Sequence, residues 1–177
     1  INEKNTNFKG LERFGDNLFY IYEDYSKQSK ITTLHAIRID EETLAAKDRI
    51  VLGAFESDSK TDQATTDYKL SLDSTKVLFF VEGPERKKEN KKFFINVMDI
   101  NLNSIWKRDI ELPIGYRFVS IYDQDLTNDG TVIVAIKHYD KEVTREVIRD
   151  EGQKTPSYVY KLYVYQKDEQ KPREILF

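Results

Sequence analysis

The stretch DLTNDGTVIVAIKHY (residues 125–139) holds the side chains that most resemble a metal site. Oxygen-bearing residues alternate before Gly130, as in the first half of an EF-hand calcium loop: Asp125, Thr127 and Asp129. Such a loop requires a bidentate carboxylate at its twelfth position, which here is Ile136 in an apolar run. The equivalent turns FGDNL and LDSTK also lack the ligand set. We therefore interpret the stretch as a hairpin turn with Gly130 at a strained position, and we expect no metal site.

Candidate catalytic residues are few. The chain has no cysteine, which excludes thiol catalysis, disulfides and cysteine-ligated zinc. Its two histidines are His35, within an expected strand, and His138, at the end of another, and neither follows a Gly-x-Ser-x-Gly elbow. A pair such as His138 with Asp140, or paired carboxylates for glycoside hydrolysis, could form only through folding. We expect no catalytic residue and no cofactor, and keep a hydrolase as the alternative.

Two charged segments supply candidate binding residues. The segment ERKKENKK (85–92) has five basic and two acidic residues, whereas residues 139–157 carry balanced charge. The first could contact an anionic polymer, although a solvated hairpin tip is the simpler interpretation. The second has the composition of an interaction arm or a lid. The candidate binding residues are Lys87, Lys88, Lys91, Arg145 and Arg149.

Composition limits the class of partner. Of the 177 residues, 39% are hydrophobic and 33% charged, with a formal net charge of −3. This balance creates no field that would gather nucleic acid or an anionic membrane, so we expect neither as a partner. No apolar run approaches the roughly 18 residues of a membrane span. The many tyrosine and phenylalanine residues favour strands.

A repeat organises the chain. The stretches GDNLFYIYED, DSTKVLFFVEG and NDGTVIVAIKH each join a polar turn to an apolar run. Their turn residues Asp16, Asp73 and Asp129 are 57 and 56 positions apart (73−16 and 129−73). One strand-like segment precedes each turn, and two more follow each apolar run. Regular spacing of this kind indicates a repeat protein.

Each repeat predicts a four-stranded blade. The runs after the turns are apolar at consecutive positions, so both of their faces should be covered, whereas the last strand of each unit alternates as an outer strand should. We predict an all-β fold with three four-stranded antiparallel blades of a partial β-propeller, at about 7–53, 67–113 and 118–177, in one domain, 1–177. A two-sheet β-sandwich is the alternative, but it does not predict a repeating turn.

The repeat also resembles a known family. SLDSTKVLFF and TNDGTVIVAI resemble the Ser/Thr-x-Asp-Gly-Lys/Thr turn of TolB-like and WD-type propeller repeats, and FFINVMDINLNSIWKRDIELP resembles the outer half of such a blade. The layout is similar to uncharacterised propeller-like envelope proteins of Gram-negative bacteria. The first unit departs from the motif with FGDNL. The resemblance implies a fold and a periplasmic, cell-surface or secreted location, but no functional residue.

Three blades leave two apolar faces open, because closed propellers have roughly four to eight. We therefore expect further blades of a longer chain, or self-association. The expected loops at 25–30, 54–66, 83–92 and 139–157 all lie on one face, which is typical of a binding surface on a rigid scaffold, although loop length can also drift without function. We predict a non-catalytic binding or scaffold module for a protein or carbohydrate ligand. The alternative is a fragment of a glycosidase-like propeller enzyme with its active residues at the central channel.

Overall fold

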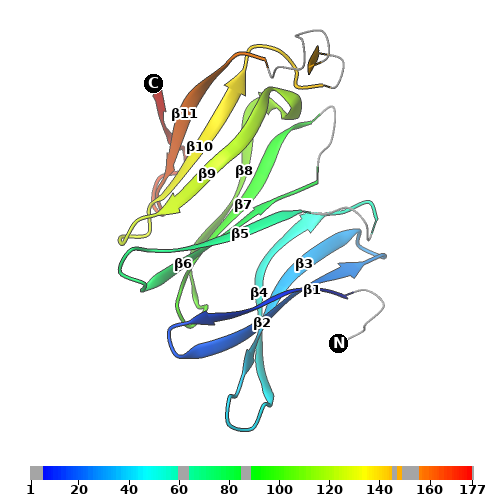
Figure 1. The fold of residues 1–177 in the computed structure, drawn as a ribbon, viewed down its shortest axis with the longest axis vertical. Helices are drawn as coiled ribbons and strands as arrows, with labels where there is room; N and C mark the ends of the chain where they lie inside the picture. The colour runs from blue at the N-terminus through cyan, green and yellow to red at the C-terminus, as the bar shows by residue number, and fades with distance from the viewer. Residues whose placement is uncertain (1–5, 60–63, 85–88, 145–146, 149–155, 177) are drawn as a thin grey trace.

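The computed structural model describes residues 6–59, 64–84, 89–144, 147–148 and 156–176. Three four-stranded antiparallel sheets contain all of the strands in these residues (Figure 1). The first sheet contains β1 (Thr6–Phe14), β2 (Asn17–Ser26), β3 (Ile31–Ile39) and β4 (Ala46–Glu56). The second contains β5 (Thr65–Leu70), β6 (Lys76–Glu82), β7 (Asn90–Asp99) and β8 (Ser104–Gly115). After a 3-10 turn (Tyr116–Phe118), the third contains β9 (Val119–Leu126), β10 (Val132–Tyr139), β11 (Tyr158–Tyr165) and β12 (Arg173–Leu176).

Each sheet is a simple meander in which every strand pairs with its neighbour in sequence. The predicted all-β fold with three four-stranded blades is therefore confirmed. The alternative of a two-sheet sandwich is wrong, because the three sheets bury two separate hydrophobic cores. One core lies between the first and second sheets and the other between the second and third. In the described part of the chain, no helix is long and apolar enough to cross a membrane.

The position of β6 between the two cores explains why its sequence is apolar at five consecutive positions. Val77, Phe79 and Val81 belong to the core shared with the first sheet, and Leu78 and Phe80 belong to the core shared with the third. All five side chains are buried. The second sheet is thus covered on both faces, as the repeat predicted for a strand without polar alternation.

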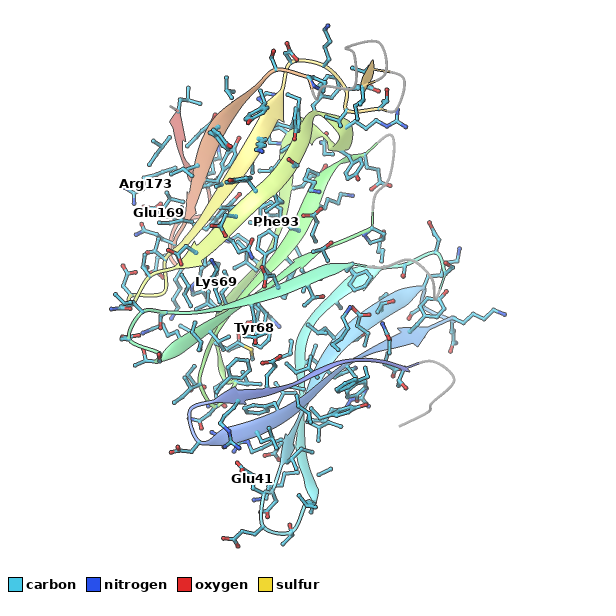
Figure 2. The ribbon with its side chains drawn as sticks, viewed as in Figure 1. Glu41, Tyr68, Lys69, Phe93, Glu169 and Arg173 are labelled. Atoms are coloured by element: carbon cyan, nitrogen blue, oxygen red, sulfur yellow. The ribbon has the colours of Figure 1, made fainter. Side chains whose placement is uncertain are left out.

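Aromatic and polar contacts tie the sheets together. Tyr68 of β5 donates a hydrogen bond to Glu12 of β1 at 2.5 Å and packs edge-on against Phe14, with ring centroids 5.5 Å apart (Figure 2). On the other side, Phe93 of β7 packs edge-on against Tyr165 of β11 at 6.0 Å. These contacts fix the second sheet between its two neighbours.

The aspartate turns before β6 and β10 share one hydrogen-bond pattern. Asp73 Oδ1 accepts hydrogen bonds from the Ser71 hydroxyl at 2.7 Å and from the Thr75 N–H at 3.1 Å. Asp129 Oδ1 likewise accepts from the hydroxyl two residues before it and from the N–H two residues after it. The spacing Ser/Thr-x-Asp-x-Thr therefore has a structural cause. In the first sheet Gly15, with a φ of 57°, makes a shorter turn, in keeping with its departure from the motif.

The two aspartate turns also contact each other across the sheets. Asn128 Oδ1 accepts a hydrogen bond from the Asp73 N–H at 3.0 Å, and the Asn128 carbonyl accepts one from Lys76 Nζ at 2.6 Å. Gly130, with a φ of 90°, completes the second turn, and its carbonyl accepts a hydrogen bond from Trp106 Nε1 at 3.0 Å. The turns therefore set both the strand register and the packing of neighbouring sheets.

We predict that Gly130→Val destabilises the fold by about 1–3 kcal/mol, because a β-branched residue is strained at a positive φ. Gly83→Val is the matched control, since a Cβ at Gly83 would meet no atom within 4 Å. Urea denaturation followed by circular dichroism measures both. Equal stability of the two variants would contradict the structural role of Gly130.

Acid should weaken the turn at Asp73. Hydrogen bonds from the Ser71 hydroxyl and then the Thr75 N–H lower the pKa of Asp73. A carboxylate with a depressed pKa in the folded state stabilises the fold above its unfolded pKa, about 3.9, and this stabilisation is lost as the pH falls through the folded pKa. Asp73→Asn should therefore lower the free energy of unfolding at pH 7 but not at pH 2, whereas the exposed control Asp48→Asn should change little at either pH. A difference that persists at pH 2 would count against this account.

Candidate functional site

The connections of one end of the molecule form the candidate binding surface. Figure 1 shows the end of β6 and the start of β7 at the right of the view, and the turns before β6 and β10 at the left. The β2–β3 connection is shorter than the sequence suggested, because β2 runs to Ser26 and β3 begins at Ile31. The elaborated loops therefore belong to the second and third sheets and to the link between the first two.

A cleft of about 530 Å³ lies at this end, between the first and second sheets. Its first wall is the end of β4, including Phe55 and Glu56, and its opposite side comes from β7 and β8. The two sheets approach each other closely beside it, since a Cβ added to Gly53 would lie 3.0 Å from the ring of Phe94. The remaining lining includes Ile31, Pro84, Glu89, Lys92, Ile110 and Tyr116. The cleft thus combines aromatic and aliphatic surface with charged groups at its edge.

Carboxylates dominate the charge that the described residues give this cleft. Lys92 Nζ lies 3.1 Å from Glu89 Oε2, and this contact, followed by the charges of Glu111 and Glu56, raises the pKa of Lys92. Asn90 Nδ2 donates a hydrogen bond to Glu111 at 3.0 Å. Asp109 is exposed on β8, the strand that also carries Glu111, and it lines the cleft as well. A ligand that enters therefore meets one lysine among several acidic groups.

Lys91 is the only predicted binding residue among the described ones, because Lys87, Lys88, Arg145 and Arg149 lie outside them. Its side chain is buried in the cleft lining. The ammonium donates a hydrogen bond to the carboxylate of Glu82 and lies 4.9 Å from the ring centroid of Tyr116. Lys91 therefore supports the wall of the cleft, with its charge neutralised inside the protein.

The histidines occupy two different places. His35 is buried on the outer face of the first sheet, stacked on Tyr22 at 5.2 Å and in contact with the Arg49 guanidinium at 2.7 Å. Burial and then the positive charge of Arg49 lower its pKa, which favours the neutral ring. His138 and Asp140 line a second hollow at the same end as the cleft, beside the third sheet. Among the described residues, no group of three or more His, Asp or Glu side chains could hold a metal ion.

Trp106 is a packing residue. Its place in the segment SIWKRDI predicts a packing residue of an outer strand, whereas a role in sugar stacking would require exposure on the loop face. It lies on the outer strand β8, is buried in the core between the second and third sheets, and donates its indole N–H to the turn at Gly130. The packing interpretation is confirmed, and sugar stacking at this residue is excluded.

No protein-family model, curated protein or solved structure matches the chain. The resemblance to TolB-like and WD-type repeats therefore rests on the turn motif and the blade layout alone.

Sequence reasoning missed the acidic edge of the cleft. Asp109 and Glu111 alternate along the outer strand β8, so the sequence does place them on one face of that strand. Glu56 is more than fifty residues away and reaches the same cleft only because the first sheet packs on the second. That contact has no local signal in the sequence.

Calcium should leave the stability of the protein unchanged. The Asp129 carboxylate is already engaged by its own turn, and position 136 places a buried isoleucine where a calcium loop requires a carboxylate. Thermal melts with calcium and with a chelator should coincide. A calcium-dependent rise of several degrees in the melting temperature would show that the turn binds the ion.

Proposed function

We propose that this chain is a non-catalytic binding or scaffold module of a bacterial envelope or secreted protein. Its ligand contacts the end of the sheets that carries the long connections. The observation that supports this most is the cleft of about 530 Å³ between the first and second sheets, a size typical of ligand pockets. The envelope or secreted location of the protein is supported only by the resemblance of its repeats to TolB-like and WD-type repeats.

A segment of a partner protein suits the cleft best. Phe55, Phe94 and Ile31 offer partly exposed apolar surface, and Glu56, Glu89, Asp109 and Glu111 add acidic groups. Such a lining favours an apolar side chain flanked by a basic one, because the first is removed from water while the second meets a carboxylate. A carbohydrate would use the same aromatic surface with hydrogen bonds to the carboxylates.

Short synthetic peptides test this proposal. Peptides with a central leucine or phenylalanine flanked by lysine should shift the amide NMR signals of residues around Phe94 and Asp109, and peptides flanked by glutamate should not. Reversing the charge with Asp109→Lys should weaken binding of the basic peptides at least tenfold, which corresponds to about 1.4 kcal/mol. Lys107→Ala, on the same strand but outside the cleft lining, is the control. Equal binding of both peptide sets, or shifts confined to other surfaces, would contradict the proposal.

A glycosidase-like hydrolase is the second candidate. Asp109 and Glu111 lie two positions apart on β8, and their Cα atoms are therefore roughly 7 Å apart. Both residues line the cleft, and glycosidases act with a pair of carboxyl groups that flank the scissile bond. Release of nitrophenol from chromogenic glycosides, abolished by Glu111→Gln, would favour the hydrolase over the binding module.

A further inference from the structure

The first and third sheets each have one face on which no other described sheet packs. Figure 1 shows the second sheet between the first, at the bottom, and the third, at the top. We call the uncovered side of the first sheet the N-face; it comprises Phe8, Leu11, Leu18, Tyr20, Tyr22, His35, Arg49 and Val51. We call the uncovered side of the third sheet the C-face; it comprises Tyr122, Asp125, Ile133, Ala135, Lys137, Tyr158, Tyr160, Leu162 and Ile175. Both faces expose large apolar or aromatic side chains.

Strand pairing shows what the C-face corresponds to inside the molecule. In the second sheet Glu82 pairs with Phe93, and in the third sheet Lys137 pairs with Tyr160 at the equivalent register. Phe93 is 4% exposed because the third sheet covers it, whereas Tyr160 is 37% exposed. The C-face is therefore the counterpart of the face with which the second sheet contacts the third.

The N-face corresponds to the face with which the second sheet contacts the first. Leu18, Tyr20 and Tyr22 follow the turn of the first sheet on the face away from the second sheet. The equivalent positions of β6 are those that the first sheet covers, and they are fully buried: Val77, Phe79 and Val81. The N-face is therefore built like a face that receives the preceding sheet.

The chemistry of the two faces is complementary. Lys137 lies 4.5 Å and 4.7 Å from the ring centroids of Tyr122 and Tyr158, and the structure shows it in no ion pair with another described residue. The C-face thus offers exposed tyrosine rings together with the exposed carboxylate of Asp125. The N-face offers the half-exposed guanidinium group of Arg49, which already contacts Asp24 at 3.5 Å, beside aliphatic side chains. Guanidinium groups bind well to both carboxylates and tyrosine faces.

We propose that the C-face of one copy docks on the N-face of a second copy. The contact repeats the junction between the second and third sheets, with Tyr160 in the place of Phe93. It is a heterologous contact, because the two faces differ. Two copies joined at both ends place six sheets in one ring, within the four to eight of closed propellers.

Light scattering after size-exclusion chromatography tests the proposal. The wild-type chain should have twice its own mass of 20.9 kDa, without further growth as concentration rises. Leu11→Asp on the N-face and Tyr160→Asp on the C-face should each give the 20.9 kDa monomer. Leu72→Asp is the control, because Leu72 is 93% exposed in the turn before β6, outside both faces. Circular dichroism checks that each variant remains folded.

Mixing the two variants separates this arrangement from a symmetric one. Leu11→Asp retains an intact C-face and Tyr160→Asp an intact N-face, so their mixture should recover a dimer through one wild-type junction. A symmetric contact between two C-faces would leave Leu11→Asp dimeric and Tyr160→Asp monomeric in the mixture. That result overturns the proposal. A wild-type chain that stays monomeric and binds a dye for exposed apolar surface also overturns it, and would indicate that a sheet from elsewhere covers these faces.

Discussion

The burial of both faces of β6 is the constraint on which the rest of the structure depends. An antiparallel strand with one wet face alternates, and Val77 to Val81 do not, so a sheet must lie on each side of the second sheet. The first and third sheets meet that requirement, and in doing so each leaves one of its own faces without another sheet from the described residues. The two cores, the cleft between the first two sheets and the uncovered end faces all follow from this stacking.

The fold could be predicted from the sequence because its signals are local and repeated. The turn residues Asp73 and Asp129 recur at regular spacing, and each is followed by an apolar run whose burial requires a neighbouring sheet. The prediction of buried faces was too general, however. In β10 only alternate residues are fully buried, because Ile133 and Ala135 face the uncovered side of the third sheet. The apolar sequence of a strand indicates that both of its faces can be buried, but not whether a neighbouring sheet lies on each face.

The candidate site was predicted less well than the fold. The sequence indicated the end of the molecule that carries the long connections, and the cleft lies there. The sequence predicted basic binding residues. Lys91, however, is paired with Glu82, and the accessible charge of the described cleft is mainly acidic. The acidic residues come from two sheets separated by about one repeat. Their meeting depends on how the sheets pack, which single-sequence patterns of alternation and spacing do not encode.

The meander order of each sheet has a consequence for how the chain folds. Every strand pairs only with its neighbour in sequence, so most pairings close a short loop at small entropic cost, the exception being β10 with β11, which residues 140–157 connect. Low sequence separation of contacts is associated with fast folding, whereas the two cores join residues a whole repeat apart. The hairpins are therefore expected to form early and the docking of sheets to come later. The hydrogen bond from the Asp73 N–H to Asn128 belongs to that late step, because it joins two sheets that have formed independently.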